Sequence, residues 1–494
     1  MSSKSLAKNA VYKTILNIFN LIVPLLIGPY VTRIITEDLM ASYNTAYSNF
    51  QVFFVIGAFG IYNYGMREIS KIRDDKQKMN RLFTSLFLLG VVSNVLTIAY
   101  FLFFYLSHTS GVDTSIYFIM ILRLISNIFY IEFINEAIEN YGFITKKTII
   151  VRLFYLLSIF LFVRKSDDVL PYTFIICMTV VINNVISYFY LKKSIEFDFE
   201  CLDIFTHIGP LIVSLLLTNV EILYSTVDRI MLGEYVSKNA VNYYTIPYNI
   251  SGMIFTIPQS LITVAIPRLS HRIGTGDKKG YCDTLNQTID IFMALLIPMC
   301  IGVAVLAYEV LYLYCGNQYL SSLGFMSAVM IAACIQRIVL GYQCIVSNLV
   351  MYANSLEKAL VLFLGIFGFC NVGLNYFLLY IGEFTSLTSL FTTSISYLLF
   401  IVITSLYSMK RLEIKYKLLS KRILGYFIVC ACFFPIAYAI RLIEVNYLIH
   451  IVLISGICSL LYGIYLYVTK DPLLKIIVEK MKLQKLITKL HLKI

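Results

Sequence analysis

Residues 359–380 read ALVLFLGIFGFCNVGLNYFLLY, and this charge-free stretch decides the class of fold. A helix needs about 20 consecutive, mostly apolar residues to cross the hydrocarbon core of a bilayer. Residues 359–370 show no alternation of apolar and polar side chains, whereas strands of a membrane β-barrel alternate. A helix also satisfies its own backbone hydrogen bonds in lipid. The segment therefore predicts a transmembrane α-helix.

Similar segments recur along the whole sequence, which has 494 residues, 59% hydrophobic and 14% charged. That composition is typical of an all-α polytopic membrane protein. We expect about fourteen spans, because each apolar stretch has about the length that a bilayer requires. Their approximate ranges are 11–35, 46–68, 82–107, 115–138, 148–163, 170–191, 207–232, 243–268, 285–313, 322–350, 357–381, 385–409, 424–442 and 447–469.

Lys and Arg residues cluster in alternate connections between these spans, and the positive-inside rule therefore orients the chain. Lys4, Lys8 and the connection containing Lys146 and Lys147 are predicted to be cytoplasmic, whereas the connection at Glu383 is predicted to be external. An even number of spans then places both termini in the cytoplasm. The net charge of +12 lies mostly on the cytoplasmic side, where it favours anionic lipid head groups as partners and not nucleic acid.

The sequence lacks the motifs of common enzymes and ATP-driven pumps. Residues 274–280, GTGDKKG, are basic and Gly-rich but do not match a phosphate-binding loop. The five His residues are isolated, and the eleven Cys residues show no spacing typical of a metal site or a disulfide framework. We therefore expect no enzyme, no metal and no cofactor. Coupling to H+, to Na+ or to the membrane potential remains open.

The two halves of the sequence resemble each other. Residues 43–49, YNTAYSN, match residues 243–249, YYTIPYN, and Tyr141 with Lys147 matches Tyr352 with Lys358. Each half holds six spans, so both halves insert in the same orientation, as in transporters built from parallel repeats. We predict an N-terminal six-helix lobe at 1–200, a C-terminal six-helix lobe at 201–412, two additional transmembrane helices at 413–470 and a basic amphipathic cytoplasmic tail at 471–494.

Four arginines fall within or at the ends of predicted spans: Arg33, Arg123, Arg229 and Arg337. An ionised side chain near the bilayer centre costs roughly 2.5–3.5 kcal/mol and therefore needs a reason. Arg33 and Arg229 occupy equivalent outer ends, from which both side chains can also snorkel to the head groups. Arg123 and Arg337 lie deeper. Because a guanidinium binds phosphate oxygens in a forked geometry, these four residues are candidates for binding phosphate or pyrophosphate.

Acidic residues accompany the arginines within the predicted spans. Glu132, Glu136 and Glu139 have the spacing to share one face of the helix predicted over 115–138, opposite Arg123. The alternative is that only Glu132 is buried and that Glu136 and Glu139 belong to the cytoplasmic connection. Glu221 and Asp228 share a face of the helix predicted over 207–232. These carboxylates are candidates for counter-ions of the arginines or for a proton, sodium or choline site, and the sequence does not separate these roles.

Tyrosines gather at equivalent places in the two halves, namely Tyr43 and Tyr47 in the first half and Tyr243 and Tyr244 in the second. Tyr residues at helix ends usually belong to the interfacial belt of a membrane protein, and that interpretation explains most of the 38 Tyr residues. Their aromatic faces are also candidates for stacking on sugars or holding a quaternary ammonium group.

Three short stretches carry a family resemblance: residues 28–30, GPY, residues 227–233, VDRIMLG, and residues 240–244, AVNYY. Together with the six-plus-six repeat and two extra helices, the chain resembles the polysaccharide-transporter (Wzx-type) flippases of the multidrug/oligosaccharidyl-lipid/polysaccharide exporter superfamily. The resemblance implies a V-shaped bundle working by alternating access. It also implies an undecaprenyl-pyrophosphate-linked oligosaccharide as cargo, moved from the inner to the outer leaflet, with arginines of a central cavity meeting the pyrophosphate.

The composition, rich in Lys, Ile, Asn and Tyr and free of Trp, points to an AT-rich genome and a bacterial plasma membrane. The chain looks most like streptococcal teichoic-acid or capsule repeat-unit flippases, and a teichoic-acid cargo bearing phosphocholine would use the membrane glutamates and Tyr clusters. Proteins of cell-envelope assembly are further candidate partners. Two alternatives stay open: a cation-coupled multidrug or metabolite exporter of the same superfamily, and a non-transporting scaffold.

Overall fold

The computed structural model describes residues 3–106, 109–200 and 202–474. Within these residues the chain is helical and contains no strand. Nine of the described helices are long and apolar enough to cross a membrane. The prediction of an all-α polytopic membrane protein is therefore confirmed, whereas the predicted number of spans stays a prediction.

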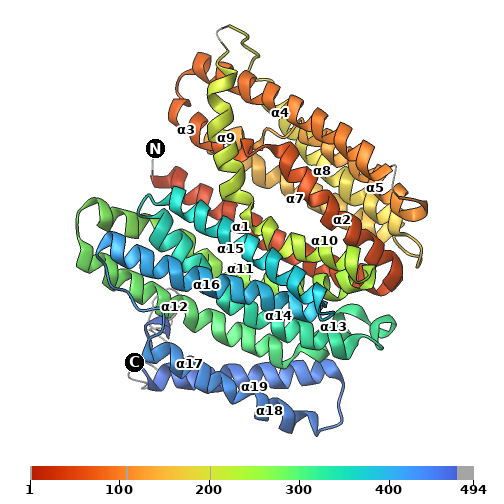
Figure 1. The fold of residues 1–494 in the computed structure, drawn as a ribbon, viewed down its shortest axis with the longest axis vertical. Helices are drawn as coiled ribbons and strands as arrows, with labels where there is room; N and C mark the ends of the chain where they lie inside the picture. The colour runs from red at the N-terminus through yellow and green to blue at the C-terminus, as the bar shows by residue number, and fades with distance from the viewer. Residues whose placement is uncertain (1–2, 107–108, 201, 475–494) are drawn as a thin grey trace. The chain divides into compact units, whose positions relative to one another are not determined.

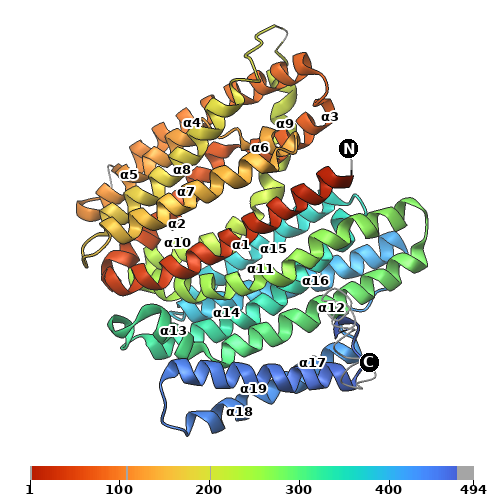
Figure 2. The ribbon, with the colours of Figure 1, turned by 180° about the vertical axis from the view of Figure 1, so that it is seen from behind.

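Contacts divide the chain into two compact units, Met1–Asn242 and Tyr243–Ile494 (Figures 1 and 2). We call them unit 1 and unit 2 and describe each by itself. The predicted boundary between the two lobes lies at residue 200. The boundary between unit 1 and unit 2 lies at residue 242, which is 42 residues later (242 − 200) and inside α11 (Lys238–Gly274).

Unit 1 contains ten α-helices and one 3-10 segment before α11 begins. They are α1 (Ser3–Ile34), α2 (Glu37–Ala58), α3 (Ile61–Ile72), α4 (Lys76–Leu106), α5 (Gly111–Asn127), α6 (Glu132–Ala137), α7 (Tyr141–Phe162), α8 (Val169–Leu191), α9 (Ile204–Asn219), η1 (Val220–Leu223) and α10 (Ser225–Tyr235).

Three spans of unit 1 that we predicted as single helices are interrupted. The span at 46–68 is divided at Phe59 and Gly60, both of which have a positive φ. The span at 115–138 is divided by residues 128–131, and the span at 207–232 is divided around η1. The prediction of continuous helices was wrong here because hydropathy depends on apolar composition and does not show where a helix is interrupted.

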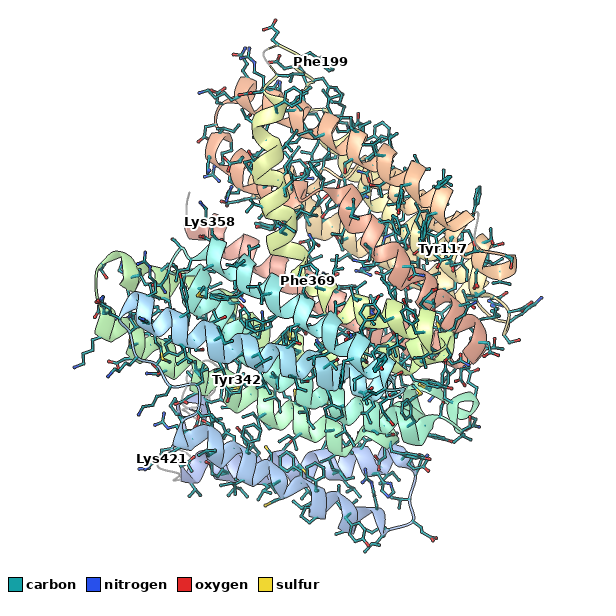
Figure 3. The ribbon with its side chains drawn as sticks, viewed as in Figure 1. Tyr117, Phe199, Tyr342, Lys358, Phe369 and Lys421 are labelled. Carbon is teal, nitrogen blue, oxygen red and sulfur yellow. The ribbon has the colours of Figure 1, made fainter. Side chains whose placement is uncertain are left out.

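The interruptions in unit 1 separate two hydrophobic clusters. One cluster gathers buried residues of α1, α2, α4, α5, α7 and α8, including Phe50, Leu124 and Ile159. The second gathers residues of α3, α4, α6, α8 and α9, including Ile69 and Leu211. The polar contact from Asn49 to the Tyr117 hydroxyl (2.8 Å) ties α2 to α5 within the first part (Figure 3). The two halves of the spans at 46–68 and 115–138 therefore pack into different cores.

Unit 2 contains the remaining described helices. They are most of α11, α12 (Lys278–Val305), α13 (Ala307–Cys315), η2 (Asn317–Tyr319), α14 (Leu323–Cys344), the π-helical segment η3 (Ile345–Tyr352), α15 (Glu357–Tyr380), α16 (Ser386–Leu412), α17 (Lys421–Ala431), α18 (Phe433–Arg441) and α19 (Tyr447–Val468). The start of several helices is fixed by a side chain that accepts a hydrogen bond from the first turn. These caps are Asp277, Thr385, Ser420 and Asn446.

The C-terminal helices α17, α18 and α19 lie along one edge of unit 2 beside α12 (Figures 1 and 2). Lys421 marks the beginning of α17 in Figure 3. The Tyr462 hydroxyl on α19 donates to the Ala294 carbonyl on α12 (2.6 Å), which fixes the two helices to each other. Residues 475–494, which make up most of the predicted amphipathic tail, lie outside the described residues.

Candidate functional site

Glu132 belongs to a buried ion pair in unit 1. Its Oε2 atom lies 2.7 Å from Lys147 Nζ, and the Ser187 hydroxyl donates to the same oxygen. Lys147 Nζ also donates to Ser187 Oγ (2.6 Å). The relative exposure of Glu132 is 8% and that of Lys147 is 4%, so both charges are removed from solvent. α6, α7 and α8 thus meet at one charged contact, and the carboxylate of Glu132 is already neutralised.

Lys147 does not lie in a connection as predicted, because it is buried on α7 while Lys146 next to it is exposed. The side of the membrane on which it lies stays a prediction. Its predicted repeat equivalent, Lys358, is exposed at the start of α15 (Figure 3). A basic pair beside an apolar stretch looks like a membrane-end marker in sequence. The buried partner could not be recognised, because Glu132 and Lys147 lie on different helices.

The predicted acidic face of Glu132, Glu136 and Glu139 is also wrong as a feature of one helix. α6 ends at Ala137, and Glu139 follows it with a φ of 58°. Glu136 is half-buried on α6. Because residues 128–131 separate α5 from α6, the predicted opposition of these residues to Arg123 does not hold.

Arg123 on α5 lies over aromatic rings of α2. Its guanidinium carbon is 4.7 Å from the ring centroid of Phe54, 5.5 Å from that of Tyr47 and 5.9 Å from that of Phe50. The Nε atom is buried without a hydrogen-bond partner among the residues that the structure describes. No carboxylate in the same described ranges forms a salt bridge with Arg123.

Arg337 in unit 2 shows a similar stacking arrangement with different polar contacts. Its guanidinium carbon is 3.9 Å from the ring centroid of Tyr248 on α11. Its Nη2 donates to the Tyr248 carbonyl (2.9 Å) and its Nε donates to Ser251 Oγ (3.2 Å). With a relative exposure of 6%, Arg337 connects α14 to α11 inside unit 2. An arginine thus lies over a tyrosine in each unit.

Asp228 and Arg229 lie on α10, after the interruption of the predicted span. Asp228 is fully buried. Arg229 is half-buried, and its guanidinium donates to the Ser225 carbonyl (3.1 Å) and to Thr226 Oγ1 (3.3 Å) in the first turn of the same helix. The predicted shared face of Glu221 and Asp228 is wrong because the helix is not continuous between them. The side chain of Glu221 lies outside the described residues.

Arg33 is exposed in the last turn of α1. The predicted tyrosines have mixed environments. Tyr43 has a relative exposure of 7%, stacks on Tyr47 at 6.0 Å and meets Tyr172 edge-on at 4.9 Å. Tyr244 is fully buried. Tyr244 stacks on Tyr248 at 5.2 Å, and Tyr243 meets Phe325 edge-on at 6.1 Å.

A polar seam between α15 and α16 was not predicted. Asn371 and Asn375 are fully buried, one helical turn apart on α15. Thr392 Oγ1 donates to Asn375 Oδ1 (2.5 Å), and Thr393 Oγ1 donates to Asn371 Oδ1 (3.3 Å). The signal was present in the sequence, because two Asn residues four positions apart in an apolar span share a face.

Two family models match the chain. The model described as polysaccharide biosynthesis protein matches residues 6–272, more than half of the sequence, and the MatE model matches residues 210–377. A probable flippase of Haloferax volcanii, AglR, is 26% identical over 123 residues. This alignment spans a quarter of that protein's length and a quarter of the present chain.

Solved structures of similar fold include two transporters. The lipid II flippase MurJ in an inward closed conformation gives a TM-score of 0.71 at 14% identity, covering 92% of this chain and 99% of MurJ. A multidrug resistance MATE family transporter of the MOP superfamily, in an inward-facing conformation, gives a TM-score of 0.63 at 10% identity, covering 80% of this chain and 94% of that structure. The chain therefore has the all-helical membrane fold of these two structures and belongs to the polysaccharide biosynthesis protein family.

Proposed function

We propose that this protein is a flippase that moves an undecaprenyl-pyrophosphate-linked oligosaccharide from the inner to the outer leaflet by alternating access. Family membership and the likeness to a lipid II flippase support this class of activity. The observation that carries the proposal is Arg123, a cation within the helical bundle of unit 1 that stacks on three aromatic rings.

The energetics of Arg123 favour an anionic ligand. Inserting a charged side chain into the bilayer centre costs roughly 2.5–3.5 kcal/mol. A desolvated cation–π contact returns about 2 kcal/mol, which offsets only part of that cost. Because the described residues supply no carboxylate for Arg123, a phosphate or pyrophosphate oxygen is the fitting partner for its guanidinium. Arg33, Arg229 and Arg337 stay further candidates for binding phosphate or pyrophosphate.

The polymer that we propose is a teichoic-acid or capsule repeat unit. The ion pair with Lys147 does not support Glu132 as a choline counter-ion, because its negative charge is already compensated. We therefore assign recognition to the pyrophosphate common to both kinds of cargo and leave the decoration of the sugar out of the proposal. In this scheme the protein catalyses no covalent reaction, and it is a transporter and not an enzyme.

The test is depletion of the protein in its host, followed by extraction of lipid-linked intermediates and rescue with variants. We expect an undecaprenyl-linked oligosaccharide to accumulate on the inner leaflet and to disappear when the wild-type chain returns. Arg123→Gln should reduce transport at least about tenfold, since removing one partner of a buried charge pair costs 2–5 kcal/mol. Arg67→Gln is the matched control, because Arg67 also faces an aromatic ring (5.8 Å from Tyr64) but is exposed and paired with Glu68.

A cation-coupled multidrug exporter is the second candidate, favoured by the match of residues 210–377 to the MatE model. It predicts a different outcome of the same experiment. Depletion would then cause no build-up of lipid-linked oligosaccharide, and the cells would become sensitive to cationic drugs. That result, or full rescue by Arg123→Gln, would contradict the flippase proposal.

A further inference from the structure

Unit 2 has a cleft of about 990 Å³ where α13, α18 and α19 come together. The polar and aromatic groups at this cleft include Tyr308, Glu309, Arg441, Glu444, Tyr447 and His450. Neither the predicted cargo-binding residues nor the polar seam between α15 and α16 contributes to it. The cleft therefore needs an explanation of its own.

The main charges of the cleft cancel each other. Arg441 Nε lies 2.6 Å from Glu309 Oε1, and Arg441 Nη2 lies 2.8 Å from Glu309 Oε2, which makes a forked ion pair. Nη2 also donates to the Val305 carbonyl (2.6 Å). With Arg441 engaged in this way and Glu444 exposed nearby, the cleft offers no excess positive charge. It is unsuited to a phosphate head group, which needs uncompensated donors.

His450 supplies a buried acceptor at this cleft. Its side chain is at 7% relative exposure, and Nε2 lies 3.0 Å from the Ile443 carbonyl. A carbonyl can only accept, so Nε2 carries the hydrogen and Nδ1 of the neutral ring is an acceptor. Nδ1 has no hydrogen-bond partner within the described part of the chain. A buried polar atom left in this state costs about 1–3 kcal/mol, which a hydroxyl donor of a ligand would recover.

Three tyrosine rings extend this surface. The ring centroids of Tyr447 and Tyr308 are 5.8 Å apart, and those of Tyr447 and Tyr312 are 4.6 Å apart. Tyrosine combines a flat apolar ring with a hydroxyl that both donates and accepts. A sugar ring has the complementary surface, with an apolar C–H face and hydroxyls around its rim. The compensated charge of Arg441, a buried acceptor and aromatic rings together match an uncharged sugar.

An apolar groove of about 470 Å³ adjoins the cleft, and Val305 lines both. α12 and α19 form its sides, with Leu473 and Leu474 beyond α19. Gly302 on α12 and Gly463 on α19 line this groove, and a Cβ at either position would meet no heavy atom within 4 Å. The groove thus has unfilled apolar space that a hydrocarbon chain fits.

We infer that unit 2 binds one glycolipid, with its uncharged sugar head in the cleft of Glu309, Arg441 and His450 and a hydrocarbon chain in the groove between α12 and α19. This site is separate from the cargo proposal, and it would exist even if the transported molecule were a drug. The continuity of a polar cleft with an apolar groove selects a lipid as the occupant and not a free sugar.

The experiment uses the full chain, purified in detergent, and native mass spectrometry with diglucosyl diacylglycerol as the probe and phosphatidylglycerol as the comparator. We expect one tightly held probe molecule, retained at least tenfold better than phosphatidylglycerol. Gly463→Leu and Gly302→Leu should each fill the groove and reduce retention about tenfold. His450→Phe should also reduce it, because Phe keeps an aromatic ring but removes the Nδ1 acceptor.

Gly456→Leu is the matched control on α19, since a Cβ there also meets no heavy atom within 4 Å but Gly456 does not line the groove. It should retain the probe as the wild type does. Equal retention in Gly463→Leu and Gly456→Leu would mean adventitious binding in the lipid belt and would overturn the inference. Equal retention of phosphatidylglycerol and the probe by the wild type would overturn it without any variant.

Discussion

Burial of Lys147 against Glu132 has an energetic consequence for unit 1. Removing one partner of a buried ion pair leaves the other charge without compensation, which typically costs about 3–5 kcal/mol. Replacing both partners by neutral groups of similar size avoids that cost. The ion pair also joins α6 to α7, so its loss acts on two elements at once.

We predict that Lys147→Met lowers the free energy of unfolding of the purified protein by about 3–5 kcal/mol. The double variant Lys147→Met/Glu132→Gln should recover part of this loss. Thermal unfolding in detergent measures both effects. Lys146→Met is the control, because Lys146 is exposed and its removal should change stability by no more than about 0.5 kcal/mol. A double variant as unstable as the single one would rule out the unpaired charge as the cause.

Arg123 and Lys147 illustrate what sequence can and cannot give at the scale of single residues. Arg123 was found because a charge in an apolar stretch is visible without a structure. The stacking of Arg123 on Phe54 and the pairing of Lys147 with Glu132 could not be found from the sequence, since both depend on contacts between helices. Whether the predicted residues bind cargo stays a prediction.

At the scale of elements, the turn between α2 and α3 depends on one glycine. Gly60 has a φ of 68°, and a Cβ at this position would lie 2.6 Å from the Leu215 nitrogen and 2.7 Å from the Leu211 carbonyl oxygen of α9. Residues with a Cβ atom rarely adopt this left-handed backbone conformation. The neighbouring atoms belong to the backbone of α9, which cannot move aside. The close approach of α9 therefore requires glycine.

We predict that Gly60→Ala destabilises the protein by more than the 1–2 kcal/mol typical of a left-handed backbone alone. Thermal unfolding in detergent and the yield of monodisperse protein are the measurements. Gly209→Ala on α9 provides the comparison, because a Cβ there meets no heavy atom within 4 Å. It should be neutral or slightly stabilising. Equal melting temperatures for the two variants would show that α9 does not approach the turn closely.

The interruptions of the helices show the limit of sequence reasoning about elements. Residues 128–131, which read IFYI, are as apolar as the helices around them, so hydropathy continues through the break. A glycine at position 60 is a recognisable sign of a break between helices, whereas the sequence at the end of α5 contains no such sign. The uninterrupted spans α8, α15, α16 and α19 lie close to their predicted ranges because their ends carry turn or polar residues.

At the scale of the whole molecule, the distribution of Lys and Arg predicts the orientation in the membrane. Lys279 lies in the first turn of α12, at the end of a basic stretch, and Glu383 lies in the connection before α16 that is poor in Lys and Arg. Both residues are exposed. Positive-inside placement therefore puts them on opposite sides of the bilayer.

We predict that Glu383→Cys reacts with a membrane-impermeant maleimide in intact cells, and that Lys279→Cys reacts only after permeabilisation. The unmodified chain serves as the control for its native cysteines, since Cys432 is exposed. Reaction of Lys279→Cys in intact cells would reverse the predicted orientation. It would also place both termini outside the cytoplasm.

The all-helical class was predictable from composition, because lipid leaves few ways to satisfy a backbone. The cleft bounded by Arg441 and His450 was not predictable, although both residues were visible near predicted span ends. Glu309, the partner of Arg441, lies 132 residues away in sequence. No local sequence pattern indicates a contact between residues so far apart in the chain.

The division of unit 1 into two cores has a consequence for its synthesis. The members of the first cluster end at Cys177, whereas the second needs Leu211 from α9. A nascent chain can therefore close the first core before the second, which waits until the seventh predicted span has left the ribosome. A fragment ending at residue 200 would lack Leu211 and expose the second core to chaperones and proteases, whereas a fragment ending at residue 242 would carry every member of both.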